Sequence, residues 1–406
     1  MKTQPVSVGK VFMTAVGAVL LHVAVAVSAN AQDPGAEASQ ARQQFELQPR
    51  GYVQFDWRGY PDWTVAPGSG RLDFNTVEIR RLRAGVDGQW RRLSFEFGID
   101  PMDDFDGALI KDAYVQVGVS RALRIRGGQF KLPGGREYGM SATSLNFMER
   151  SGFAQATGTG RDMGVMATGR IRRRIDYEAG VFAGDGVGRN SRAGFTTAGR
   201  IVWNGRNDLT FAASASEGRT VAVDSDPANG IQGHATSGYR FFDPLYVQGR
   251  RDRIGIDLEW SPGPWRLSAE GLRVYDQRHN QGLDGEDLPA AVSLGWNSAI
   301  VREFGRRRGA ARSRLREWDL GFRVDGFSFD DDGPSTGRDS VRPRATDVRA
   351  RDALTVMAGL SWNLARWARV MTNGGLERYL ESRSAPEPGR RGNYWTVATR
   401  LQLELP

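Results

Sequence analysis

The sequence predicts an all-β protein, a transmembrane antiparallel β-barrel of about 16 strands with an infolded constriction loop. Three observations predict it: apolar and polar residues alternate with a period of two, an export leader opens the chain, and the composition is rich in glycine and free of cysteine. The alternation is clearest at residues 393–404. One face of that strand carries Trp395, Val397, Thr399, Leu401 and Leu403, and the other carries Thr396, Ala398, Arg400, Gln402 and Glu404.

A two-residue period indicates a strand whose faces meet unlike environments. In a soluble sandwich the charged face would meet water and the apolar face a core, and a soluble periplasmic β-sandwich is the alternative fold. In a membrane barrel the apolar face meets lipid and the polar face lines a lumen. The leader and the composition favour the barrel.

Residues 1–31 have the pattern of a secretory signal peptide, with Lys2 and Lys10 ahead of an apolar run and a small-x-small site at 29–31. An uncleaved membrane anchor is the alternative interpretation. No later stretch is apolar for the roughly 18 residues that a membrane-spanning helix requires. We therefore expect a signal peptide at 1–31, a short periplasmic segment at 32–48 and an outer-membrane barrel domain at 49–406.

The composition argues against catalytic chemistry. The chain has no cysteine and three histidines, of which His22 lies in the leader and His234 and His279 lie in expected loops. That leaves little material for a thiol or zinc site or a His-dependent triad. A barrel lipase would need a serine and a histidine on one strand face. We expect no enzyme activity, cofactor, metal or nucleic-acid partner.

Strand candidates and connectors organise the chain as hairpins. The short connectors alternate with long ones, which places the long set outside the cell if the N-terminus is periplasmic. The long connector at 301–314 breaks this rule and carries six arginines. The sixteen strand candidates begin near residues 50, 72, 92, 109, 121, 161, 173, 194, 207, 250, 264, 289, 315, 351, 366 and 392.

Arginine dominates the expected lumen face of the first half. Arg81 and Arg83 share one face of their strand, as do Arg124 and Arg126 of a later strand, and Arg200 opposes apolar neighbours. Such residues would attract anions and replace part of their hydration. Pairing with carboxylates on neighbouring strands is the alternative for each of them. Arg80 breaks the alternation, which indicates a bulge or the end of the lipid zone.

The connector at 131–160 is the candidate constriction. It begins at Lys131 and carries Arg136 and Arg150, opposed by Glu137 and Glu149. A loop this long is functional or disordered. Apolar residues at 140, 145, 147, 148 and 153 favour packing inside the lumen over an exposed flexible loop. The expected anion pathway is Arg80, Arg81, Arg83, Arg124, Arg126, Lys131, Arg136, Arg150 and Arg200.

Several stretches resemble the phosphate-selective porin O and P family over nearly the whole chain after the leader. In the first half these are Arg80–Val86, Ile110–Tyr114, Arg126–Pro133 and Phe147–Ser151, and in the second half Glu317–Leu320, Gly359–Leu364 and Thr399–Leu403.

The resemblance implies a sixteen-stranded outer-membrane porin, usually a homotrimer, that passes anions along an arginine ladder past an infolded third loop. It maps the ladder onto Arg80, Arg81, Arg83, Arg124 and Arg126, and the constriction onto the loop starting at Lys131. The implied partners are phosphate or pyrophosphate, chloride, outer-membrane lipid and lipopolysaccharide. Lysine is nearly absent, Gly134-Gly135 replaces a more usual aromatic, and Pro406 replaces the terminal aromatic. A structural or adhesive barrel with a plugged, non-conducting lumen is the alternative function.

Overall fold

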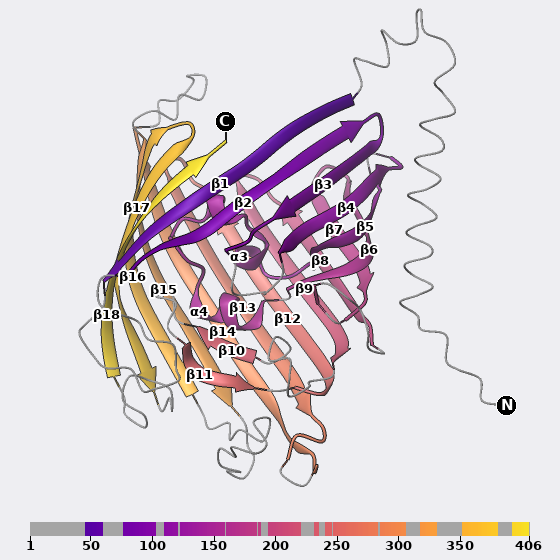
Figure 1. Cartoon of the computed structure of the whole chain (residues 1–406), viewed down its shortest axis with the longest axis vertical. Helices are drawn as coiled ribbons and strands as arrows, with labels where there is room; N and C mark the ends of the chain where they lie inside the picture. The colour runs from indigo at the N-terminus through magenta and orange to yellow at the C-terminus, as the bar shows by residue number, and fades with distance from the viewer. Residues whose placement is uncertain are drawn as a thin grey trace, which may run out of the picture.

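The chain forms a closed antiparallel β-barrel of sixteen strands in the computed structural model (Figure 1). Each strand pairs with its sequence neighbour, β9 pairs directly with β12, and β18 closes the barrel on β1. The structure describes residues 45–59, 76–102, 109–120, 122–158, 160–184, 186–187, 194–220, 231–234, 240–245, 247–282, 285–305, 317–330, 351–380 and 392–405.

The barrel strands confirm the predicted count. They are β1 (Phe45–Gly59), β2 (Thr76–Trp90), β3 (Leu93–Ile99), β4 (Ile110–Gly118), β5 (Arg124–Lys131), β6 (Arg161–Ile171), β7 (Ile175–Phe182), β8 (Thr196–Asn204), β9 (Leu209–Thr220), β12 (Gly249–Trp260), β13 (Trp265–Arg278), β14 (Leu288–Phe304), β15 (Trp318–Asp330), β16 (Arg351–Ala365), β17 (Ala368–Leu380) and β18 (Gly392–Glu404).

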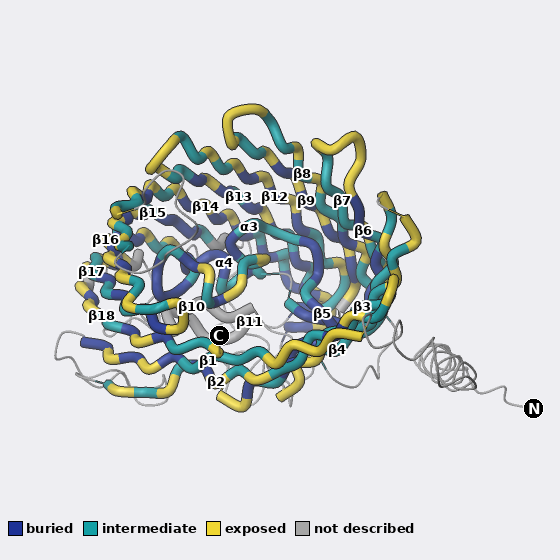
Figure 2. Tube along the Cα trace, turned by 90° about the horizontal axis from the view of Figure 1, so that it is seen from above, coloured by how far each residue is buried: buried dark blue, intermediate teal, exposed yellow. Residues whose placement is uncertain are grey.

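The period-two pattern sorts the side chains as the sequence predicts. On β1, Gln54 and Asp56 are buried inside the ring, whereas Phe55 and Trp57 are exposed on the outer surface. Figure 2 shows the same alternation of buried and exposed positions along the strands of the wall. The outer face is therefore apolar and the inner face polar, the reverse of a soluble sandwich.

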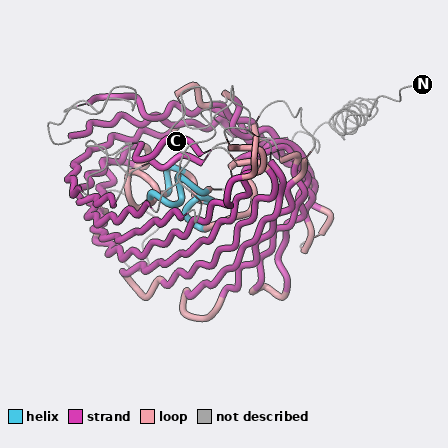
Figure 3. Tube along the Cα trace, turned by 90° about the horizontal axis from the view of Figure 1, so that it is seen from below, coloured by secondary structure: helices cyan, strands magenta, loops and turns pink. Residues whose placement is uncertain are grey.

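The connector between β5 and β6 lies inside the ring, and we call residues 132–160 the inner loop. It contains α3 (Arg136–Gly139), the 3-10 helix η1 (Ala142–Ser144) and α4 (Gly152–Thr157). Figures 2 and 3 show its helices surrounded by barrel strands. These three short helical turns are a difference from the sequence prediction, which gave the connector no secondary structure.

A two-stranded sheet, β10 (Ile231–His234) and β11 (Arg240–Leu245), stands apart from the barrel order. It lies in the long connector between β9 and β12, and β10 lies against α4 (Figure 1). His234 thus ends a short strand, where the sequence indicated a loop.

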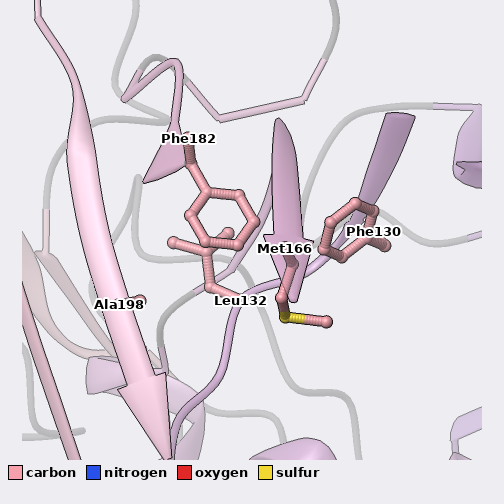
Figure 4. Packing of buried hydrophobic residues seen from close by; sticks show 5 residues of the cluster. All are labelled: Phe130, Leu132, Met166, Phe182 and Ala198. Carbon is pink, nitrogen blue, oxygen red and sulfur yellow. The ribbon is translucent and has the colours of Figure 1, made fainter. Parts of the chain in front are cut away.

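A small apolar cluster lies on the inner wall at the base of the inner loop. Phe130, Met166, Phe182 and Ala198 come from the adjacent strands β5 to β8, and Leu132 is the first residue of the inner loop after β5 (Figure 4). The Phe130 and Phe182 rings meet edge to face with centroids 5.5 Å apart. Because these side chains exclude water, they fix the direction in which the chain leaves β5.

Two local expectations can be compared with the structure. The register between β1 and β2 shifts after Gln54, which pairs with Arg81, while Phe55 pairs with Ile79. Arg80 is therefore the extra residue of a β-bulge, one of the two options that the broken alternation left open. Strand β1 begins at Phe45, inside the expected 32–48 segment, because it continues to pair with β2 as far as Trp90.

Some predicted features lie outside the described residues: the signal peptide at 1–31 and most of the basic connector at 301–314, namely 306–314. Among the described residues, no helix has the length and apolar character needed to cross a membrane.

Candidate functional site

Glu149 is the point at which the inner loop meets the most positive charge. Its Oε1 lies 3.0 Å from Arg80 Nε, 3.1 Å from Arg58 Nη2 and 2.7 Å from Arg400 Nη2. Its Oε2 lies 3.1 Å from Arg81 Nη2. One carboxylate thus joins the inner loop to strands β1, β2 and β18, on both sides of the barrel's closure.

The charges around Glu149 are buried and only partly compensated. Asp56 accepts two hydrogen bonds from Arg400, at 2.6 and 2.7 Å, and one from Arg58 at 2.8 Å. Burial raises the pKa of Glu149, but the surrounding guanidinium groups lower it more, so this pKa is well below its ordinary value. Glu149 is therefore a permanent anion at physiological pH.

A second anchor holds the middle of the inner loop to β14 and β15. Arg323 donates to the Glu149 carbonyl at 2.9 Å and lies 3.3 Å from the Glu137 carboxylate. Glu137 also accepts from Asn297 at 3.1 Å and from the Ser151 hydroxyl and backbone. The two acids of the inner loop are thus both used to attach it to the wall.

Glycines on the inner wall make room for the aromatic residues of the inner loop. A Cβ on Gly321 or on Gly359 would lie 3.1 or 3.0 Å from the Phe147 ring. A Cβ on Gly295 would overlap the Phe153 side chain. Arg323 covers Phe147, with its guanidinium carbon 4.8 Å from the ring centroid. The strand glycines therefore allow the inner loop to pack closely against β14, β15 and β16.

A cavity of about 60 Å³ remains between the inner loop and the wall formed by β1, β2 and β5. One water needs roughly 10–15 Å³ of such space, so the cavity can hold several waters or a small anion. Six cations and two carboxylates line it, a formal charge of +4: Arg80, Arg81, Arg83, Lys131, Arg150, Arg161, Asp100 and Glu149. Its remaining walls include Tyr52 and Tyr138.

The cavity cations fall into two groups. Arg80 and Arg81 bind Glu149, while Arg83 and Arg161 both contact Asp112, at 2.6 and 3.1 Å. In the part of the chain that the structure describes, Lys131 and Arg150 have no carboxylate partner. Lys131 Nζ donates to the carbonyls of Tyr138 and Met140 at 2.9 and 3.0 Å.

Arg150 likewise donates to two carbonyls of the inner loop, those of Glu137 at 3.0 Å and Met140 at 2.6 Å. Hydrogen bonds to neutral acceptors leave the formal charge of a cation uncompensated. Lys131 and Arg150 are therefore the principal sources of unbalanced positive charge in this cavity.

The structure brings five of the nine predicted pathway residues into the cavity and places four elsewhere. Arg136 pairs with Glu259 at 2.5 Å, and Arg200 holds Asp257 by two hydrogen bonds of 2.5 and 2.8 Å. Arg124 and Arg126 lie on β5 toward its short turn. Arg126 contacts Gln116 and lies over the Tyr114 ring, 4.2 Å from its centroid.

Sequence reasoning missed several arginines that hold the inner loop in place, among them Arg58, Arg323 and Arg400. Each sits on the polar face of an alternating strand, but so do many others. The available signal was the pair of buried acids, Glu137 and Glu149, in a loop with several apolar residues. Two carboxylates that enter a lumen must find cations there, because an uncompensated buried charge is expensive.

The Gly134-Gly135 pair has a steric explanation. A Cβ on Gly135 would overlap the Glu270 carboxylate, and the Gly134 carbonyl accepts a hydrogen bond from Arg200 at 2.7 Å. Glu270 in turn accepts from the backbone N–H of Glu137 at 2.9 Å. A bulky side chain at position 135 would push the inner loop away from β13 and disturb the start of α3.

A sixteen-stranded barrel with an apolar outer face, a polar inner face and a cationic inner cavity defines an outer-membrane channel of the porin class. The phosphate-selective porin O and P family model matches residues 45–403, and the chain belongs to this family. No curated protein matches the sequence.

Solved structures share the fold at low sequence identity. The anion-selective porin from Comamonas acidovorans is 12% identical with a TM-score of 0.56, over 89% of this chain and 100% of that one. The outer-membrane channel DcaP of Acinetobacter baumannii is 10% identical with a TM-score of 0.56, over 90% and 98%. The trimer form of OmpT from Vibrio cholerae is 12% identical with a TM-score of 0.55, over 89% and 100%. At such identities the likeness establishes the fold alone.

Proposed function

We propose that this protein lets small anions diffuse passively across the outer membrane, and that they bind in the cavity between the inner loop and β1, β2 and β5. The observation that carries the proposal is the +4 formal charge of the cavity lining. A positive site with low-dielectric walls raises the local concentration of anions. Conduction also requires each contact to be weak enough to release its ion.

Lys131 and Arg150 are the proposed anion-binding residues. Their donors contact backbone carbonyls, which a passing anion can replace or share without breaking an ion pair. An anion that displaced Glu149 or Asp112 from the arginines would have to break several charged contacts at once. The carboxylate-bound arginines therefore serve mainly to hold the inner loop and shape the constriction.

Strand β5 supplies a route between the cavity and the short-turn end of the barrel. Arg126 and Lys131 are five residues apart on this strand, a rise of roughly 17 Å. Arg124 lies two residues beyond Arg126 and forms a 3.4 Å hydrogen bond with Thr168. Fixed positive charges at such intervals would pass an anion from one weak site to the next.

Phosphate is the proposed substrate among small anions, on the support of the family's description. A homotrimer is the proposed assembly, since the OmpT structure with the same fold is a trimer. We also propose that residues 1–31 are a cleaved signal peptide for export, and that the barrel inserts among the lipid and lipopolysaccharide of the outer membrane.

Planar-bilayer recording tests the function. We expect an anion-sided reversal potential under a chloride gradient, and block of the chloride current by added phosphate. A Lys131→Gln/Arg150→Gln variant should weaken the block at least tenfold. Arg250→Gln, which changes an exposed arginine at the start of β12 outside the cavity lining, should leave the block unchanged. Replacement of Arg124 and Arg126 by Glu should reduce anion preference.

Three results would count against the proposal. A closed channel with no conductance would support a plugged structural or adhesive barrel instead. An unchanged ion ratio in the Arg124→Glu/Arg126→Glu variant would remove the route along β5. Unaltered phosphate block in Lys131→Gln/Arg150→Gln would remove the cavity as the binding site.

A further inference from the structure

Arginines concentrate in the short turns at one end of the barrel. The described parts of six turns there carry seven arginines and one acid; the connector between β14 and β15 is not counted, because 306–316 are not described. Residues 91–92 join β2 to β3, residues 172–174 join β6 to β7, and Arg206 and Arg366 lie in two further turns. The acid is Asp208. All of these side chains are exposed.

Three of the arginines occupy backbone positions that disfavour them. Arg91, Arg172 and Arg173 have φ angles of 54°, 48° and 61°. This left-handed region strains a residue with a long side chain and suits Gly, Asn or Asp. The β8–β9 turn of the same chain uses Asn207 and Asp208 at 56° and 57°. Two turns thus carry a guanidinium where a smaller residue would relieve strain.

The arginines lie just beyond a girdle of exposed indoles. Trp203, Trp362 and Trp367 are 43%, 51% and 52% exposed on the outer face near this end. Arg366 precedes Trp367 directly, and Arg206 follows Trp203 by three residues. At roughly 3.4 Å per residue, the backbone of each arginine is therefore about 10 Å or less from that of its tryptophan. Indoles of such girdles sit at the level of lipid headgroups. We therefore expect these guanidinium groups to lie at the level of the lipid phosphates.

We propose that the short-turn end of the barrel binds the anionic headgroups of glycerophospholipids such as phosphatidylglycerol. Seven cations against one acid make this rim complementary to an anionic leaflet, and each basic residue strengthens attraction to such a surface by about fivefold. Among the described residues of the long-connector end, the exposed Arg250 has acidic partners, since it lies 2.7 Å from Asp252 and 3.6 Å from Glu217. The proposal is independent of ion conduction.

Tryptophan quenching by brominated lipid tests this rim. The full-length protein is reconstituted in phosphatidylcholine bilayers with increasing amounts of brominated phosphatidylglycerol, and the relative association constant is read from the quenching curve. Wild type should prefer phosphatidylglycerol several-fold, and high salt should reduce the preference. The Arg172→Asn/Arg173→Gly variant should lose about half of it or more.

The matched control is Arg219→Asn/Arg250→Asn, which removes two exposed arginines from the opposite end of the same wall. This control should keep the preference of wild type. A heat-modifiable gel shift verifies folding of each variant, and Arg91→Asn replaces the turn variant if that one fails to fold. The turn variant should also melt no lower than wild type, because its new residues suit a positive φ.

A relative association constant of one for wild type, meaning no preference for phosphatidylglycerol over phosphatidylcholine, would overturn the proposal. So would equal losses in the turn variant and its control, since the effect would then be one of net charge. If the turn variant kept its lipid preference but changed the reversal potential, the turn arginines would belong to the pore mouth instead.

Discussion

Replacing Glu149 with Gln should detach the inner loop from the wall of the barrel. The substitution keeps the side chain's shape and removes its charge. Asp56 would still bind Arg400 and Arg58, and Gln54 would still accept from Arg81 at 2.9 Å. Arg80 would lose its carboxylate partner. The group of four arginines would then have two anions, Asp56 and Glu78, instead of three, and Glu78 reaches only Arg58, at 3.1 Å.

The size of the effect follows from this remaining compensation. Removing one partner from a buried ion pair costs about 3–5 kcal/mol, largely because the opposite charge is left uncompensated. Since Asp56 and Gln54 remain, we expect the lower end, about 3 kcal/mol. That free energy changes the equilibrium between attached and detached inner loop by roughly 150-fold.

Bilayer recordings would measure the detachment directly. We expect Glu149→Gln to increase both the mean conductance and the current noise, because the inner loop spends more time away from the wall. Trypsin should also cut faster after Arg150. The control Glu217→Gln, which neutralises an exposed acid near the end of β9 and away from the inner loop's anchors, should behave as wild type. Conductance, noise and cleavage all equal to wild type would refute the role of Glu149 as the anchor.

Two further predictions concern the same attachment. The pKa of Glu149 in the folded protein is lowered from its ordinary 4.5. Ionised Glu149 therefore stabilises the attachment of the inner loop fully above pH 4.5, and this stabilisation is lost only as the pH falls through the lower folded-state pKa. Conductance and noise should therefore stay constant from pH 7 to 4.5 and rise only in stronger acid; a rise between pH 6 and 5 would contradict this. Gly295→Ala should displace Phe153 and α4, at a cost of about 1–3 kcal/mol, and should therefore raise the current noise. The control Gly271→Ala, whose Cβ would have its nearest neighbour at 4.0 Å, should leave the noise unchanged. Matching noise in the two alanine variants would exclude the glycine contact.

The barrel could be predicted from the sequence because its determinants are local. Period two decides which side chains point outward, and turn residues decide where each hairpin reverses, so all sixteen strand starts fall within four or five residues of the observed ones. The irregularity at Arg80 was visible as a break in that period, and the pairing of β1 with β2 identified it as a bulge. The β10–β11 hairpin and the helices of the inner loop lack such a pattern, and they were not predicted.

The partners of the arginines could not be predicted in the same way. Arg81 and Arg83 alternate identically on β2, yet Arg81 binds Glu149 of the inner loop and Arg83 binds Asp112 of β4. Lys131 and Arg150 differ from them by having carbonyl partners, which depends on how the inner loop turns after Leu132. A sequence gives the number of charges on a face but not the distances between them.

The sequence by itself determined the barrel, its strand count and the concentration of positive charge on its inner face, because alternation and hairpin spacing act between near neighbours. Only the tertiary structure decided which cations are compensated. Glu149 lies 91 residues from Arg58 and 251 residues from Arg400, and the three meet because the barrel closes β18 on β1 and the inner loop crosses to that seam. Electrostatic compensation depends on separations of a few ångströms, and those are set by closure and packing.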